Sequence, residues 1–234
     1  MRKRMNEKLS VWAASLLVVV GSSAVKAQEN VEVSIGADVV SEYIWRGTYC
    51  GGLSVQPSIS IAKSGFSLTA WGSVGINAED TKEVDLTLGY GAGGFGVALT
   101  DYWFNTQDSP RYFDYRSRGA HVLEATVGYD FGPVALSWNT NVAGYDYYKE
   151  NGKRAYSSYV EAVVPFKLGG FDFAAEIGAT PWEGAYSDGL NVTNIGLGVS
   201  KEIKVTDSFT LPAFAKVTAN PFEDRTYFVF GLTF

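Results

Sequence analysis

The chain ends in Thr226-Tyr227-Phe228-Val229-Phe230-Gly231-Leu232-Thr233-Phe234, an uncharged stretch in which large apolar residues recur at every second position. Alternation with a period of two places residues 228, 230, 232 and 234 on one face of a β-strand. At the edge of an open sheet, such a strand would be an aggregation hazard. In a closed barrel its edge is used by pairing with the first strand. The stretch therefore predicts the closing strand of a β-barrel.

The N-terminus predicts an export signal over residues 1–27. Four basic residues lie within positions 2–8, residues 9–20 form an apolar core, and Val25-Lys26-Ala27 offers a cleavage site before Gln28. The apolar core is too short to span a membrane comfortably as a helix. We therefore expect a signal peptide, residues 1–27, followed by one barrel domain, residues 28–234, in the bacterial outer membrane.

Composition narrows the classes of protein that the exported part can form. Residues 1–27 hold five of the 19 basic and one of the 25 acidic residues, so the remainder carries a net charge of about −10. An acidic protein is a poor nucleic-acid binder. The one cysteine, Cys50, cannot form an internal disulfide and is interpreted as a loop residue. With no apolar run of 18 residues, a periplasmic β-sandwich and an outer-membrane barrel remain.

About twelve alternating segments of roughly ten residues follow the signal, an even number that suits a transmembrane barrel. Tight turns alternate with long polar loops at 105–119, 144–154 and 181–191, which a sandwich has no reason to do. The predicted fold is an all-β, up-and-down antiparallel transmembrane barrel with both termini periplasmic. The predicted strands are residues 31–45, 53–62, 66–76, 83–91, 95–104, 120–131, 134–143, a segment ending near 166, 171–179, 192–204, 209–219 and the terminal stretch.

The cost of charge in lipid assigns the two faces. A charge near mid-membrane on the lipid face costs roughly 2–4 kcal/mol, so the face carrying the strand charges is predicted to line the lumen. Asp101 is the clearest exception. Aromatic residues near strand ends on the outward face predict interfacial girdles: Tyr43, Trp45, Tyr90, Trp103, Tyr129 and Phe131.

Several stretches resemble known outer-membrane patterns. The terminal strand, with Phe230, Leu232 and Phe234, resembles the insertion signal of bacterial outer-membrane barrels. Ser41-Glu42-Tyr43-Ile44-Trp45-Arg46-Gly47 resembles the S-x-Y-x-x-R-G segment of the TorF-type porin family, and the stretches 57–73 and 83–87 resemble its following strands. The resemblance covers about the first third of the exported chain and implies a small outer-membrane barrel without catalytic residues.

A narrow diffusion channel for small solutes is the favoured function. Twelve tilted strands give a backbone radius of roughly 12 Å. Lumen carboxylates predict a preference for cations, with Glu124 and Glu161 contributing most and Arg46 paired with Glu42. The predicted lumen charges are Asp38, Glu42, Arg46, Asp85, Glu124, Glu161, Glu176 and Lys216. The predicted constriction is formed by Trp71, Tyr102, Tyr159 and Phe214.

Two alternatives stay open at this stage. The first is a non-conducting structural or assembly-partner barrel, with Tyr-rich loops as its surface. The second is a lipid-modifying enzyme built on His121 and its diagonal neighbour Asp101, but the outward face offers no serine nucleophile nearby. No motif predicts a metal or cofactor. The expected partners are outer-membrane lipid and lipopolysaccharide, the barrel-assembly machinery and small solutes.

Overall fold

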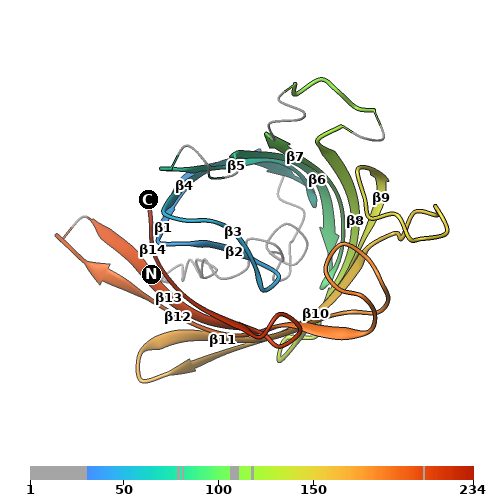
Figure 1. Cartoon of the computed structure of the whole chain (residues 1–234). Coiled ribbons are helices and arrows are strands. Elements are labelled where there is room, and N and C mark those ends of the chain that lie inside the picture. The colour runs from blue at the N-terminus through green and yellow to red at the C-terminus, as the bar shows by residue number, and fades with distance from the viewer. Residues whose placement is uncertain (1–30, 78–79, 81, 106–110, 117–118, 208) are drawn as a thin grey trace.

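The computed structural model describes residues 31–234 except 78–79, 81, 106–110, 117–118 and 208, and it is a closed antiparallel β-barrel (Figure 1). Twelve strands form the wall, as the sequence predicts, in the cyclic order β1-β14-β13-β12-β11-β10-β9-β8-β7-β6-β5-β4. The wall strands are β1 (Glu32–Val40), β4 (Ser54–Lys63), β5 (Phe66–Gly75), β6 (Lys82–Ala92), β7 (Phe95–Asn105), β8 (His121–Asp130), β9 (Ala135–Gly144), β10 (Ser158–Leu168), β11 (Phe171–Thr180), β12 (Asn191–Lys204), β13 (Thr210–Asn220) and β14 (Arg225–Thr233).

The terminal strand closes the barrel, as its sequence predicts. The register between β1 and β14 pairs Asp38 with Thr233 and Val40 with Gly231. Beyond that register, the backbones of Ala37 and Phe234 exchange two hydrogen bonds, of 3.1 and 2.9 Å. This seam is short, because the first half of β1 pairs only with β4. The last residue of the chain therefore contributes directly to closure.

The wall is apolar outside and polar inside. On β6 every second residue is buried, and the buried positions include Glu83, Asp85 and Thr87, while the exposed positions include Leu86 and Leu88. Outward side chains stay highly exposed, with Ile35 at 78%. An exposed apolar wall around a polar interior is stable in lipid and not in water. Of the two classes left open by the sequence, the transmembrane β-barrel is therefore the right one, and the β-sandwich is excluded.

The two ends of the barrel differ in their connections. The end that holds Glu32 and Phe234 has short turns, such as that at Gly93 and Gly94, whose positive φ angles suit a tight hairpin. The opposite end carries the longer loops, and we call it the long-loop end. The predicted signal peptide, 1–27, lies outside the described residues. Among the residues the structure describes, no helix is long and apolar enough to cross a membrane.

The end of one predicted wall strand is not in the wall. The sequence predicts a single strand over residues 31–45, but β1 ends at Val40, and residues 41–53 then leave the wall. They form a two-stranded hairpin, β2 (Tyr43–Trp45) and β3 (Thr48–Gly51), which Figure 1 shows inside the ring of strands. We call residues 41–53 the lumen hairpin. The prediction that Tyr43 and Trp45 belong to an outward girdle is therefore wrong, whereas Tyr90, Tyr129 and Phe131 do face outward.

Candidate functional site

The lumen hairpin is a side branch of the wall. Val40, before it, and Ser54, after it, are direct register partners, so β1 and β4 pair as if a tight turn joined them. The hairpin starts at the long-loop end and reaches across the interior. At its tip, Gly47 has φ of 80° and its Cα sits against the backbone carbonyl of Thr193 in β12, where a Cβ would collide. Asn220 at the end of β13 donates a 3.2 Å hydrogen bond to the Gly47 carbonyl.

Arg46 fixes the tip of the hairpin to the opposite wall. Its guanidinium donates two hydrogen bonds to the Glu124 carboxylate on β8, of 2.6 and 2.9 Å. Both side chains are nearly inaccessible to solvent, at 3% and 1%. The expectation that Arg46 pairs with Glu42 is wrong. β1 ends at Val40 and Glu42 lies in the bend that follows, so the two residues do not share one strand face, and the ion-pair partner of Arg46 is Glu124. The bidentate pair neutralises Glu124, one of the two carboxylates from which we expected most cation selectivity.

Aromatic rings surround this ion pair. The guanidinium carbon of Arg46 lies 4.2 Å from the ring centre of Trp45 and 4.7 Å from that of Tyr159. Tyr186, from the loop between β11 and β12, accepts a 2.6 Å hydrogen bond from Arg46, and Tyr102 donates one of 3.0 Å to Glu124. Rings that stack on a guanidinium stabilise it when water is excluded. The structure thus brings the predicted Arg46, Glu124, Tyr102 and Tyr159 into one cluster.

A second polar cluster lies on the neighbouring wall strands. Lys216 on β13 forms a 2.5 Å ion pair with Glu176 on β11. Asn194 on β12 donates a 2.7 Å hydrogen bond to the same carboxylate. Glu161 on β10 accepts a 2.8 Å hydrogen bond from the Tyr159 hydroxyl, which connects this cluster to the ring around Arg46. The predicted lumen charges Glu161, Glu176 and Lys216 therefore lie together, and of the two carboxylates Glu176 has the basic partner.

Glu83 and Asp85 form a third cluster, on β6. Both carboxyl groups are buried, at 2% and 8% exposure, and each lies within hydrogen-bonding reach of the other. The phenol of Tyr43, from the lumen hairpin, lies against both. Glu83 Oε2 and Asp85 Oδ1 have no hydrogen-bond partner among the described residues. Asp85 is among the lumen charges predicted from the sequence, and Glu83 is not.

The remaining predicted residues lie apart from these clusters. Asp38 accepts a 2.6 Å hydrogen bond from Thr233 at the barrel seam. Glu42 lies in the bend that leads into the hairpin. Trp71 packs edge-on against Tyr43 with ring centres 5.6 Å apart, and Phe214 covers Gly231 on the lumen face. The predicted insertion-signal side chains of Phe230, Leu232 and Phe234 are exposed on the outer wall.

His121 lies on the outer wall at the long-loop end, opposite Trp103 as the sequence predicts. Its Nδ1 is 2.8 Å from Asp101 Oδ1, and the Tyr115 ring stacks on the imidazole with ring centres 3.9 Å apart. The Tyr112 carbonyl contacts Nε2. Within the described chain, these partners of His121 include no serine or cysteine. The arrangement fastens the loop 111–116 to the barrel wall.

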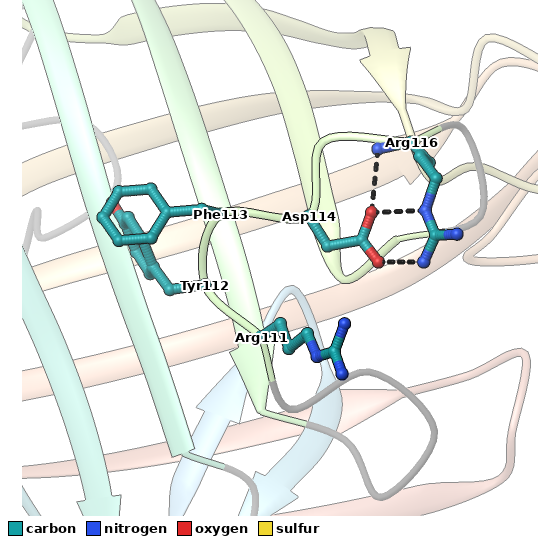
Figure 2. A pocket seen from close by; sticks show the side chains of 5 residues that line it. All are labelled: Arg111, Tyr112, Phe113, Asp114 and Arg116. Carbon is teal, nitrogen blue, oxygen red and sulfur yellow. Dashed lines mark hydrogen bonds and ion pairs between the residues drawn. The ribbon is translucent and has the colours of Figure 1, made fainter.

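That loop carries a surface cavity of about 560 Å³ lined by residues 111–114 and 116. Figure 2 shows Asp114 and Arg116 facing each other within it. The guanidinium of Arg116 holds the pKa of Asp114 at about 2. The pair is exposed, with 83% of the Arg116 side chain accessible to solvent, so it contributes little to stability. No group of three or more His, Cys, Asp or Glu side chains suited to a metal occurs in the described part of the chain.

The hairpin tip is the part of the site that sequence reasoning missed. Residues 43 and 45 continue the alternation of β1, so periodicity alone does not separate hairpin from wall. Strand length could have separated them, since a predicted strand of 15 residues exceeds the 9–11 that cross a membrane. Tyr186 was missed because its contribution depends on how a long loop folds back.

The chain matches one protein family by sequence and is similar in fold to several solved β-barrels. Residues 24–218 match the family described as "Bacterial protein of unknown function (Gcw_chp)". No curated protein matches. Among solved structures, the chain is similar to the NanC porin (8% identity, 86% of this chain and 98% of that one, TM-score 0.45). It is also similar to the KdgM porin (8% identity, 86% and 97%, TM-score 0.44). The resemblance to the TorF-type porin family is not tested by these matches and stays a prediction.

Proposed function

The chain belongs to the Gcw_chp family of bacterial proteins of unknown function, and from the geometry of its interior we propose that it is an outer-membrane channel for small solutes. The lumen hairpin sets the width of the channel and the Arg46–Glu124 pair holds it in place. We further propose that both termini are periplasmic and that residues 1–27 are a signal peptide. Outer-membrane lipid, lipopolysaccharide and the barrel-assembly machinery are its proposed contacts.

One observation carries this proposal: the lumen hairpin, which obstructs the interior, is not needed to complete the barrel wall. A barrel that serves only as a scaffold can fill its interior with wall side chains, as small barrels do. Here the wall is complete without the hairpin, because Val40 and Ser54 are already paired. The wall residues that contact Gly47 at the hairpin tip are polar: Thr193 lies against it, and Asn220 is hydrogen-bonded to its carbonyl. A polar lumen with a removable obstruction suits passage of hydrated solutes better than structural support.

We also propose that the channel prefers cations, but the carboxylates responsible differ in part from those predicted from the sequence. Glu124 and Glu176 have basic partners within bonding distance, so their fields are largely cancelled. Asp38, Glu83, Asp85 and Glu161 have no ion-pair partner in the described structure, and we infer that the preference for cations originates from this set. Carboxylates around a pore raise the local concentration of cations and repel anions.

A non-conducting barrel is the second candidate, and the hairpin itself favours it. The tip residue Arg46 is buried, with 7% of its surface accessible, as expected for a tight plug. Purified, refolded protein in planar bilayers separates the two candidates. Stepwise currents whose reversal potential in a KCl gradient has the sign for cation flow would support the channel. A folded protein that inserts without conducting would support the plugged barrel.

A further inference from the structure

Glu83 and Asp85 are an unusual feature of the lumen, because two buried carboxyl groups lie side by side with no basic side chain paired to either among the described residues. They are two residues apart on β6, which places their Cβ atoms on one face about 6.6 Å apart along the strand. Both side chains are more than nine-tenths buried, and each keeps one oxygen without a hydrogen-bond partner among the described residues. Removing ionised carboxylates from water costs several kcal/mol each unless a positive charge compensates.

The basic residues of the described interior are engaged elsewhere. Arg46 is bound by Glu124, and Lys216 is bound by Glu176. Lys82 is next to Glu83 in sequence, but the alternation of β6 points it to the opposite face, where it is exposed. The nearby charged groups that act on Asp85 besides Glu83 include Asp101 and Glu124, and neither is positive; Glu124 is itself paired with Arg46. The pair therefore has a deficit of positive charge that the described side chains do not fill.

We propose that Glu83 and Asp85 form a binding site for a hard divalent cation of the Mg²⁺ and Ca²⁺ class. Two carboxylates match the charge of such an ion, and hard cations prefer oxygen ligands. Mg²⁺ commonly binds through one or two carboxylates and keeps several water molecules, so a site with two protein carboxylates suffices. The Tyr43 phenol lies against the pair and offers a further oxygen. This site rests on the proposed function in one respect: the ion must enter the lumen to reach Glu83 and Asp85.

Because Tyr43 belongs to the lumen hairpin, the ion would join the hairpin to β6. The hairpin would then have two anchors on the same side of the barrel, the Arg46–Glu124 pair on β8 and the bound ion on β6, with β7 between them. Binding an ion to the folded state alone stabilises that state in proportion to the logarithm of the ion concentration. Divalent ions should therefore raise thermal stability in a way that depends on these two carboxylates.

Thermal unfolding of the refolded full-length protein in detergent tests this site without requiring conduction. MgCl₂ or CaCl₂ is titrated at constant ionic strength, kept with NaCl so that screening does not change. When the free ion concentration is roughly one hundred times the dissociation constant of the site, the midpoint temperature of unfolding should rise by about 5–10 °C. The double variant Glu83→Gln/Asp85→Asn should lose this shift, and Asp38→Asn, which removes a different lumen carboxylate, should keep it.

Each outcome of the experiment is decisive for the site. No divalent-specific shift in the natural protein, or an equal shift in the double variant, overturns the proposal. If the double variant does not refold, the single variant Asp85→Asn takes its place and should weaken the response at least tenfold in ion concentration. A divalent shift in a barrel that does not conduct keeps the site and rejects the channel, whereas conduction without the shift rejects the site alone.

Discussion

Replacing Arg46 with alanine should release the lumen hairpin and increase conductance. The arginine makes two hydrogen bonds to Glu124, of 2.6 and 2.9 Å, at a place where neither side chain reaches solvent. Removing one partner of a buried ion pair typically costs about 3–5 kcal/mol, because the other charge is left buried and unpaired. Since about 1.4 kcal/mol corresponds to a factor of ten, the ratio of displaced to seated hairpin should rise about 100- to 4,000-fold.

Single-channel recording in planar bilayers measures this change directly. The variant should show a higher open probability or a larger unitary conductance than the natural protein. Arg116→Ala is the matched control, because it removes an arginine from an exposed Asp114 pair and should leave the currents unchanged. The double variant Arg46→Met/Glu124→Gln removes both charges and should recover part of the closed state. Currents identical to those of the natural protein in a folded Arg46→Ala barrel would refute the reasoning.

Three further perturbations test other parts of the account. Deletion of Phe234 removes two seam hydrogen bonds and a lipid-facing ring, so the heat-modifiable folded band should disappear from outer membranes; normal amounts would contradict the role of the last residue. Gly47→Ala should mimic Arg46→Ala in bilayers, because a Cβ collides with the Thr193 carbonyl at a φ of 80°, with a backbone cost of about 1–3 kcal/mol. His121→Ala should release the loop 111–116, so that trypsin cleaves after Arg111 faster. Any lipid-modifying activity of whole membranes should stay unchanged, and loss of such an activity would argue for an enzyme.

The wall could be predicted from the sequence because lipid imposes one strict rule on it. Lipid-facing positions near the middle of the membrane must be apolar and every strand must pair, so alternation and turn residues define strands such as β6 and β14 almost to the residue. The same rule assigns the faces, and Glu124 and Glu161 are in the lumen wall as the alternation predicts. These features are local, and a single sequence contains them.

The interior could not be predicted in the same way, because its contacts join distant parts of the chain. Arg46 and Glu124 are 78 positions apart, and Arg46 and Tyr186 are 140 apart. Nothing in the neighbourhood of Arg46 in sequence indicates these partners, whereas Glu42 lies close by and has the right charge. Once the hairpin turns into the lumen, the nearest carboxylate in space is no longer the nearest in sequence.

Whether the lumen hairpin sets the width of a channel can be measured as the conductance of a barrel without this hairpin. Because Val40 and Ser54 are register partners, residues 41–53 can be replaced by a two-residue Asn-Gly turn while the pairing of β1 with β4 is kept. We expect that the natural protein conducts weakly and prefers cations, and that the shortened barrel conducts severalfold more current per channel. Equal currents from the two folded proteins, or none from either, would contradict the claim that the hairpin sets the width of a channel.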